Sequence, residues 1–413
     1  MDLHLRFERF RGKRLHVGVC GSIACYKALD LLRRWRDAGM DVGATLTDSA
    51  RRFISPLAFE ALGASPVHTS MFPGDDSAAD RDIFPHLMPG ASAHVFAVVA
   101  ASASTLSRLA HGMADEILSC QALAFPGPLV IAPAMNPRMW ANPATQANWQ
   151  LLRERGHFLV TPDSGRVACM EEGAGRLADS RDIYLAVLKA ASPQDMAGGK
   201  VMLTLGPTRE QWDGVRFWSN PSTGTMGASL AVAAWLRGAE VHAVCGPSSL
   251  PGNPWLPAGI HRHDVVSAKD MFEAASSLWP DMDTGVFTAA VADFSPVPRG
   301  PAKFKKADAG ESLEIRFTAN PDILKTLAAA RKPGQKVIGF AAETGDLENA
   351  VRGKLAAKKA DMIVGNYVNE AGSGFASPGN AVFIADAKGA EEQLPALSKP
   401  DLAWRILDWL LRL

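Results

Sequence analysis

The alternation of short apolar runs with helix-periodic segments is the feature that most constrains how this chain folds. Each run is followed by small or hydroxyl residues and then by a segment with helical periodicity. Such runs are typical of strands buried on both faces, and the helices between them allow consecutive strands to lie parallel. The sequence therefore predicts an α/β protein with two doubly wound, mainly parallel sheets of the flavodoxin or Rossmann type. The predicted strands are residues 15–20, 41–46, 93–99 and 129–132 in the first half, and 200–205, 240–245, 285–290, 336–340 and 361–364 in the second.

A break in this alternation divides the chain into two halves. Residues 190–200 read AASPQDMAGGK, and the proline and paired glycines interrupt the periodicity there. A length of 413 residues also suits two or three domains, each with its own core. We therefore predict one domain over residues 1–191 and a second over residues 192–413.

The composition is that of a globular enzyme and argues against several kinds of partner. Basic and acidic residues number 43 each, so neither nucleic acid nor a membrane surface is an expected partner. No apolar run is long enough to span a bilayer. The basic stretch at residues 6–14 is predicted to be a solvated N-terminal arm. The five cysteines show neither zinc nor disulfide spacing, which indicates a reducing, cytoplasmic location.

Small hydroxyl residues follow three consecutive predicted strands of the first half. Gly21-Ser22 follows the first strand, Thr47-Asp48-Ser49 the second, and residues 101–105 the third. Carboxyl ends of parallel strands meet at one edge of a sheet, where hydroxyls and helix N-termini favour a phosphate. Ordinary N-capping of three helices explains the same pattern equally well.

Asn136 follows the fourth strand, in the stretch IAPAMNPRMW. An asparagine at this edge offers two donors and an acceptor but does not titrate, so it suits holding a carboxylate rather than acting as a base. On local spacing alone, a helix cap is the alternative.

The motifs of the first half resemble those of the flavin-containing cysteine decarboxylases, which include phosphopantothenoylcysteine decarboxylase. GSIACYK at residues 21–27 is similar to that family's flavin-phosphate turn, PAMNPRMW to its PAMNxxMW motif, and ACMEEGAGRL at residues 168–177 to its ACGxxGxGRM substrate flap. The resemblance implies FMN as the cofactor. It implies that FMN is bound by Gly21, Ser22, Ile23, Thr47, Ser49, Ser102, Ser104, Thr105 and Asp115.

The same resemblance implies a decarboxylation in which the thiol-bearing carbon is first oxidised, with FMN as the electron sink. Asn136 would orient the substrate carboxylate, His86 would handle a proton, and Cys169 would protonate the enethiolate. Two departures leave an alternative open: Leu87-Met88-Pro89 follows His86, and Met170 replaces a glycine after Cys169. The alternative is a regulatory or scaffold domain that binds flavin without turnover. A flavin prenyltransferase-like first half is a further alternative, against which Cys169 in its glycine-rich loop argues.

The second half carries a hydroxyl- and glycine-rich stretch before a helix, residues 219–227, which is a candidate anion cradle without the Walker A ending. Lys354 and Lys358 lie one helical turn apart, an arrangement favoured by a bound anion, although a solvated helix face explains it too.

The motifs GPTRE, DGVRFWSNPSTGTMG, AAVADF, KFKK, NPDIL and GFAAET resemble, in order, those of phosphopantothenate–cysteine ligase. The resemblance implies CTP-dependent coupling of 4′-phosphopantothenate to cysteine through an acyl-cytidylate, with Mg²⁺ sharing the triphosphate charge. Asn220 would contact the acyl-cytidylate, and Lys303 would stabilise the transferring phosphate. The other implied substrate and CTP contacts are Arg216, Ala289, Asp293, Pro321, Asp322, Ile323, Leu324, Phe340, Lys354 and Lys358.

Together the two resemblances imply a bifunctional enzyme of coenzyme A biosynthesis, in which the ligase product of the second half is the substrate of the first. They also imply a homo-oligomer, trimer-based through the first half and dimeric through the second.

Overall fold

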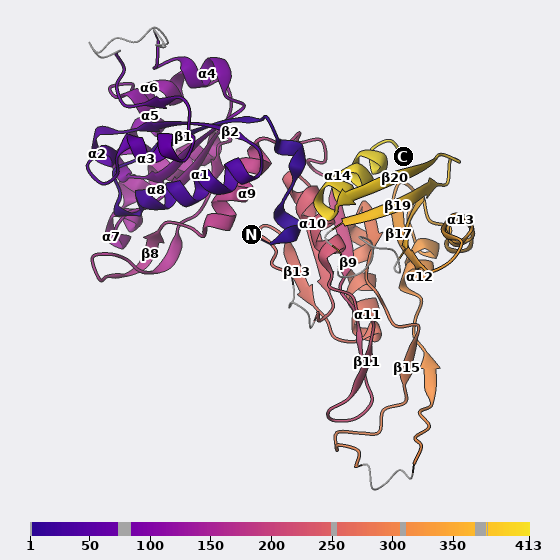
Figure 1. Ribbon diagram of the computed structural model, residues 1–413. Coiled ribbons are helices and arrows are strands. Elements are labelled where there is room, and N and C mark those ends of the chain that lie inside the picture. The colour runs from indigo at the N-terminus through magenta and orange to yellow at the C-terminus, as the bar shows by residue number, and fades with distance from the viewer. Residues whose placement is uncertain (1, 73–83, 249–253, 306–310, 368–376, 378) are drawn as a thin grey trace. The chain divides into compact units, whose positions relative to one another are not determined.

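The computed structural model describes residues 2–72, 84–248, 254–305, 311–367, 377 and 379–413 of the chain. It divides into two compact units, Glu8–Ser192 and a second that combines Met1–Phe7 with Pro193–Leu413 (Figure 1). Each unit is described by itself.

The first unit is built on a six-stranded parallel sheet in the order β3-β2-β1-β4-β5-β6. All seven residues of its central strand β4 are buried, as the apolar run predicts. The strands are β1 (Arg14–Val19), β2 (Asp41–Leu46), β3 (Val67–His68), β4 (Val95–Ala101), β5 (Leu129–Pro133) and β6 (Phe158–Leu159).

Helices cover both faces of this sheet. On one side α1 packs against α9, and on the other α5 packs against α8 over a core that includes Phe96, Ile131 and Trp149. A two-stranded hairpin of β7 (Asp163–Arg166) and β8 (Glu172–Arg176) lies apart from the sheet. The helices are η2 (Glu8–Phe10), η3 (Ile23–Tyr26), α1 (Lys27–Asp37), α2 (Asp48–Arg51), α3 (Pro56–Ala61), α4 (Met88–Ser92), α5 (Ala103–His111), α6 (Ile117–Ala124), α7 (Pro137–Ala141), α8 (Pro143–Glu154) and α9 (Ser180–Ala190).

The second unit is built on an eight-stranded sheet in the order β13-β12-β9-β14-β17-β18-β19-β20. Its first six strands are parallel, and the last two are antiparallel to their neighbours, so the sheet is mixed. The strands are β9 (Lys200–Leu205), β12 (Glu240–Cys245), β13 (His261–Asp264), β14 (Thr284–Phe287), β17 (Lys336–Glu343), β18 (Met362–Tyr367), β19 (Gly379–Asp386) and β20 (Glu391–Ser398).

Helices again cover both faces of the sheet. The helix α10, nine of whose twelve residues are buried, packs against α14, while α11, α12 and α13 enclose a core that includes Met271, Leu324 and Val351. The helices are η1 (Leu3–Leu5), α10 (Thr225–Leu236), α11 (Ala268–Leu278), η4 (Trp279–Asp281), α12 (Ile323–Ala329), α13 (Leu347–Lys358) and α14 (Lys399–Leu410).

Two antiparallel ribbons project from this unit and form an arm (Figure 1). One ribbon pairs β10 (Arg209–Gln211) with β11 (Phe217–Ser219), and the other pairs β15 (Phe294–Pro296) with β16 (Phe317–Ala319). The rings of Trp218 and Phe317 meet edge to face with centroids 5.2 Å apart, so the two ribbons lie side by side.

The predicted α/β class with two doubly wound, mainly parallel sheets is confirmed. Strands β2, β9 and β12 have the predicted bounds, whereas the antiparallel pair β19 and β20 and the arm were not predicted. The antiparallel pair was missed because the alternating apolar pattern at the start of β19 was not recognised as a strand that continues the sheet.

The predicted N-terminal arm is wrong. Leu5, Phe7 and Phe10 are buried, and η1 packs against α10 and α14 of the second unit. The apolar residues interleaved with the charges determine where this segment lies, because their burial outweighs solvation of the basic side chains. The compact units differ from the predicted halves at the N-terminus, since Met1–Phe7 groups with the second unit, while the functional division after residue 191 stays a prediction.

Within the described residues, no helix combines the length and apolarity needed to cross a membrane. All five cysteines are free thiols. The cytoplasmic location stays a prediction.

We expect Phe7→Ala to destabilise the second unit by about 3–5 kcal/mol, the usual cost of removing a buried phenylalanine. Phe7 is 1% exposed, and its ring meets Trp404 edge to face with centroids 6.0 Å apart. Leu3→Ala is the matched control, because Leu3 lies in the same segment and is 51% exposed. Thermal unfolding of the full chain measures the effect; equal transitions for both variants would contradict it.

Candidate functional site

The carboxyl ends of β2, β1 and β4 bring the three hydroxyl-bearing turns of the first unit together. The chain builds the sheet outward in both directions from β1, so the topological switch point lies between β1 and β4. Ser22 caps η3, Thr47 caps α2 and Ser102 caps α5, each accepting a hydrogen bond from a backbone N–H. The capping alternative is thus observed at all three turns. Capped helix starts at a switch point also satisfy the geometry of a phosphate cradle.

Gly21 allows the turn after β1 to lie directly against Ser49 of α2. A Cβ atom at Gly21 would lie 2.2 Å from the Cβ atom of Ser49, so any side chain here would force two strand ends apart. The backbone of the β1 turn and the α2 N-terminus therefore meet only because residue 21 is glycine.

Arg108 joins two of the predicted cofactor residues. Its Nε and Nη2 donate to the two carboxylate oxygens of Asp115 at 2.8 and 3.1 Å, and its Nη1 donates to Ser104 Oγ at 2.6 Å. The hydrogen bond from Arg108 lowers the pKa of the Asp115 carboxyl. Sequence reasoning missed Arg108, which lies one turn after Ser104 on α5 and faces the same side.

Asn136 and Cys169 meet in the structure. Asn136 caps α7, its Oδ1 accepting from the Arg138 N–H at 2.8 Å, while its Nδ2 donates to Cys169 Sγ and to Glu171 Oε2, both at 3.1 Å. The two interpretations of Asn136 therefore hold together: the oxygen caps the helix and the amide nitrogen faces a thiol and a carboxylate. The β7–β8 hairpin, rather than an irregular loop, presents Cys169 at its exposed turn.

Asn136 and Arg138 already hold one carboxylate, that of Glu171. The Arg138 guanidinium contacts both oxygens of Glu171, and the hydrogen bonds from Arg138 and then Asn136 lower the pKa of this carboxyl. This pair of donors is therefore built to bind a carboxylate group. Met170, at the tip of the hairpin, has a φ of 67°, a left-handed conformation that costs a methionine about 1–2 kcal/mol relative to glycine.

A buried polar chain anchors the turn that carries His86. His16 Nε2 hydrogen-bonds Thr45 Oγ1 at 2.7 Å, Thr45 donates to Gln121 Oε1 at 2.7 Å, and Gln121 Nε2 donates to the Pro85 carbonyl at 2.7 Å. His86 Nδ1 is buried and has no hydrogen-bond partner among the described residues. Within the described residues, His86 makes no hydrogen bond to Asn136 or Cys169, so its catalytic role stays a prediction.

The second unit contains a cavity of about 440 Å³ at the carboxyl ends of β9, β14 and β17. The sheet order reverses between β9 and β14, so this is the switch point of the second sheet. Of the predicted ligase residues, the cavity wall includes Asn220, Ala289, Asp293, Pro321, Asp322, Ile323, Leu324, Phe340, Lys354 and Lys358.

Cations and a helix N-terminus make one side of the cavity electropositive. Burial lowers the pKa of Lys354, and the neighbouring Lys358 ammonium lowers it further. Lys354 Nζ donates to the Phe340 carbonyl at 2.6 Å, and Lys358 pairs with Asp322, which also caps α12. The N-terminus of α10, capped by Gly224 at a φ of 70°, opens into the same cavity.

Several polar residues of the wall escaped prediction. Asn320, Asn366, Asn380 and Lys399 line the cavity from separate segments. Burial lowers the pKa of Lys399 to about 8. Asn320 is the first residue of the NPDIL motif and could have been predicted. Asn380 lies on β19 and Lys399 on α14, and no sequence pattern indicated that these elements lie beside the cavity.

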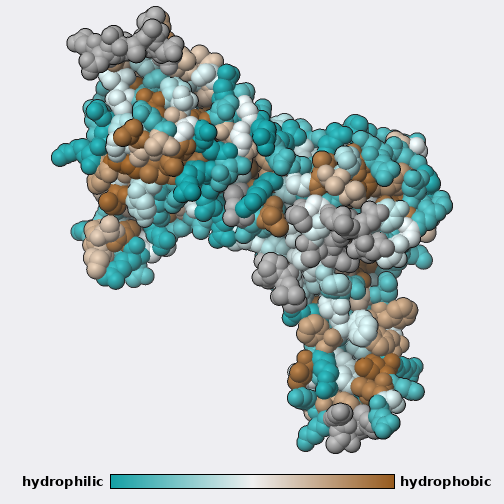
Figure 2. Space-filling model, in the orientation of Figure 1, coloured by the Kyte–Doolittle hydropathy of each residue, from teal (hydrophilic) through white to brown (hydrophobic). Residues whose placement is uncertain are grey.

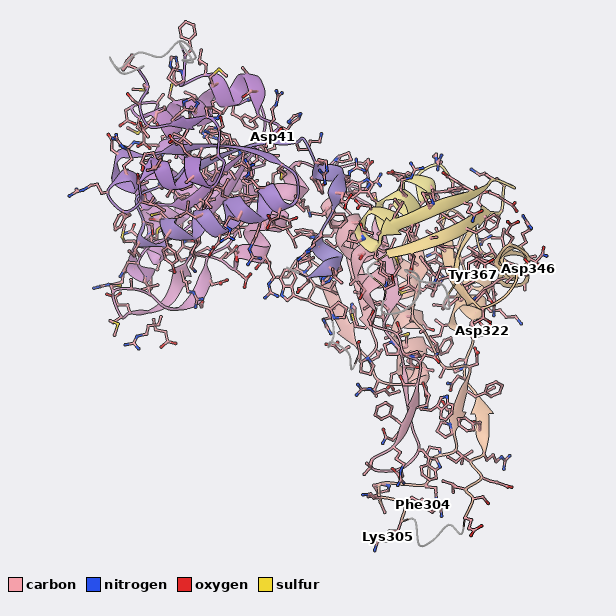
Figure 3. The ribbon with its side chains drawn as sticks, viewed as in Figure 1. Asp41, Phe304, Lys305, Asp322, Asp346 and Tyr367 are labelled. Atoms are coloured by element: carbon pink, nitrogen blue, oxygen red, sulfur yellow. The ribbon has the colours of Figure 1, made fainter. Side chains whose placement is uncertain are left out.

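Arg216 and Lys303 do not line the cavity. Arg216 Nη1 donates to Asp213 at 2.8 Å and to the Phe304 carbonyl at 3.2 Å, at the far end of the arm. Figure 3 places Phe304 and Lys305 at that end, while Asp322 and Tyr367 lie near the sheet. Burial raises the pKa of Asp213, but backbone donors and Arg216 outweigh it and hold the pKa at about 2.

Comparisons with known proteins identify the family. A family model described as "Flavoprotein" matches residues 7–192, and one described as "DNA/pantothenate metabolism flavoprotein C-terminal domain" matches residues 196–413. The chain is 40% identical over 392 residues to the coenzyme A biosynthesis bifunctional protein CoaBC of Bacillus subtilis, covering 94% of each chain. The chain belongs to this CoaBC family. The Escherichia coli K12 member is 38% identical over 399 residues, covering 96% of each chain.

A solved C-terminal domain of a CoaBC protein is 35% identical to this chain with a TM-score of 0.44, covering 53% of this chain and 97% of that one. Family membership confirms the predicted bifunctional enzyme of coenzyme A biosynthesis and the flavoprotein nature of its first unit. The scaffold alternative concerns turnover, which family membership alone does not decide.

We expect the first unit to lose stability as the pH falls below about 6.5, because burial lowers the pKa of His16 from 6.5 to about 3. Below pH 6.5 the unfolded state binds a proton at His16, whereas the folded state keeps this side chain neutral. The free energy of unfolding therefore has its full value above the unfolded pKa and declines as the pH falls below it. At pH 5 the loss is about 2 kcal/mol.

His16→Gln places an amide nitrogen close to the position of Nε2 and removes the titration. Denaturant unfolding at pH 7 and pH 5 compares the two proteins. An equal pH dependence in both would show that His16 is not the group responsible.

Proposed function

We propose that the two units catalyse consecutive steps: CTP-dependent coupling of 4′-phosphopantothenate to cysteine in the second, then FMN-dependent decarboxylation to 4′-phosphopantetheine in the first. The contact between Asn136 and Cys169 carries the proposal over the scaffold alternative. It pairs a carboxylate-binding amide with a proton-donating thiol, 3.1 Å apart, which binding of flavin alone does not require.

In the decarboxylase, the substrate carboxylate would replace Glu171 as the partner of Asn136 and Arg138. The exposed hairpin turn lets Cys169 approach the substrate sulfur region, where its thiol would deliver a proton. Gln121 fixes Pro85 and thereby positions His86 to exchange a proton. The turns at the carboxyl ends of β1, β2 and β4 would hold FMN, which would supply a reversible electron sink for the thiol-bearing carbon.

The FMN phosphate fits the turns at the carboxyl ends of β1, β2 and β4. These turns offer neutral donors from Ser22, Thr47, Ser49, Ser102 and Ser104 and from capped helix starts. The close approach at Gly21 leaves the backbone exposed toward a phosphate, and Arg108 holds Asp115 beside this region.

Gly21→Ala is expected to reduce flavin retention at least about tenfold, because the added Cβ would separate the two turns that make the cradle. Gly353→Ala is the control, since a Cβ there meets nothing within 4 Å. Absorbance of the purified proteins gives flavin per chain. Equal flavin content in both variants would remove Gly21 from the site.

In the ligase, Lys354 and Lys358 would bind the triphosphate of CTP, with the α10 N-terminus facing anionic groups in the same cavity. Mg²⁺ would share the phosphate charge, and the Asp293 and Asp322 carboxylates in the same wall are the oxygen ligands it prefers. Asn220, whose Nδ2 bonds the Ala290 and Val291 carbonyls at 3.2 Å, would contact the acyl-cytidylate.

Lys354→Met is expected to raise KM for CTP roughly 10- to 100-fold, the effect of losing one charge-assisted hydrogen bond. Lys269→Met, on α11 with a side chain 79% exposed, is the control. Steady-state release of CMP provides the measurement, and unfolding curves separate a folding defect from a binding defect. An unchanged KM in a folded Lys354→Met protein would contradict the assignment.

Arg216 and Lys303 would reach a nucleotide only after the arm moves or through a second copy of the chain. Apolar side chains gather on the arm (Figure 2), among them the exposed Val215, Phe217, Trp218 and Phe294. Exposed apolar surface of this kind supports the proposed homo-oligomer. Ile23, Tyr26, Phe53 and Leu57 form a second exposed set on the first unit.

The decisive experiment incubates the full chain with 4′-phosphopantothenate, cysteine, CTP and Mg²⁺ and follows products by mass spectrometry. We expect CMP with 4′-phosphopantetheine. In Cys169→Ser we expect CMP with phosphopantothenoylcysteine that is not converted to 4′-phosphopantetheine. If the wild-type chain forms the ligase product and stops there, the scaffold alternative is correct; a folded wild-type chain without CMP would refute the proposal.

A further inference from the structure

An imidazole-rich cluster lies at the β13 edge of the eight-stranded sheet, among residues that line no part of the cavity described above. Glu240 and His242 alternate along β12, so their side chains share one face of the sheet. His261 and His263 do the same on the adjacent strand β13, whose parallel register pairs His261 with His242. Two short strands therefore bring three imidazoles and a carboxylate to one face.

The side chains of the cluster are close enough to share one ion. The rings of His242 and His261 stack with centroids 4.6 Å apart, and His242 Nε2 lies 3.0 Å from Glu240 Oε1. One donor atom each from Glu240, His242 and His261 lies within 4.8 Å of the others. Metal–ligand distances of about 2.0–2.2 Å require separations of roughly 3.4 Å, so rotations of the exposed Glu240 and His261 side chains complete the geometry.

We propose that Glu240, His242 and His261 bind one divalent transition-metal ion of the Zn²⁺ class, and that His263 orients His242. Imidazole nitrogen and carboxylate oxygen are the donors that Zn²⁺, Cu²⁺ and Ni²⁺ prefer over Mg²⁺ or Ca²⁺. Three protein ligands leave a fourth tetrahedral position for water.

His263 supplies the outer contact that metal-binding histidines commonly have. His242 Nδ1 lies 3.2 Å from His263 Nε2, and donation from Nδ1–H to that nitrogen leaves a lone pair on His242 Nε2, which faces Glu240.

A bound ion would compete with the Lys200 ammonium for the Glu240 carboxylate. Lys200 Nζ lies 3.6 Å from Glu240 Oε1, and both side chains are 44% exposed, so this ion pair is weak. An ion bound by β12 and β13 together would tie the four-residue edge strand to its neighbour. The proposal is independent of the reactions assigned to either unit.

The test titrates the full, tag-free chain with ZnCl₂ by calorimetry after removal of metal with a chelator, in the absence of substrates. We expect one ion per chain at this site and a higher unfolding temperature of the second unit. His261→Gln should abolish this binding, and because His261 is exposed the variant should fold. His263→Gln should weaken it about 10- to 100-fold, the usual effect of losing an outer contact.

Two controls make the result specific. Asp264→Asn removes a carboxylate on the opposite face of β13 and should leave Zn²⁺ binding unchanged, as should Cys169→Ser, which removes an exposed thiol. MgCl₂ should produce no binding at the cluster. Equal Zn²⁺ affinity in the wild-type chain and His261→Gln would overturn the proposal, as would binding that disappears only in Cys169→Ser.

Discussion

The constraint on which both units depend is the reversal of strand order within a parallel sheet. At a reversal, the loops after two adjacent strands leave toward opposite faces and open a crevice between them. In the first sheet this happens between β1 and β4, where the capped turns after Gly21 and Ala101 lie. In the second it happens between β9 and β14, where the cavity lies. The polar residues of each site are useful because topology leaves this space unfilled.

Sequence reasoning located side chains correctly where local structure alone fixes their positions. Asn136 was predictable because the end of an apolar run, a proline and a capping side chain coincide there, and the side chain serves both as cap and as donor. Lys354 and Lys358 were predictable for a similar reason, since residues one helical turn apart face the same space. In both cases short-range spacing carries the information.

Prediction failed where contacts join segments distant in sequence. Lys399 reaches the cavity only because two antiparallel strands extend the sheet and place α14 beside it. The chain from His16 through Thr45 and Gln121 to Pro85 crosses three elements, and no local pattern encodes it. The prediction for the N-terminal segment was wrong for another reason. It gave the charged residues more weight than Leu5 and Phe7, whose burial determines where the segment lies. Arg216 and Lys303 matched motifs, but a motif does not say how far its side chains stand from the cavity.

The N-terminal segment makes the second unit discontinuous, so the first unit is an insertion within it. Residues Met1–Phe7 precede the flavoprotein unit in the sequence, yet their partners on α10 and α14 follow it. The flavoprotein unit can thus complete its fold while the second unit still lacks most of its chain. Expression of Pro193–Leu413 alone would leave the apolar surface that receives Leu5 and Phe7 without its cover.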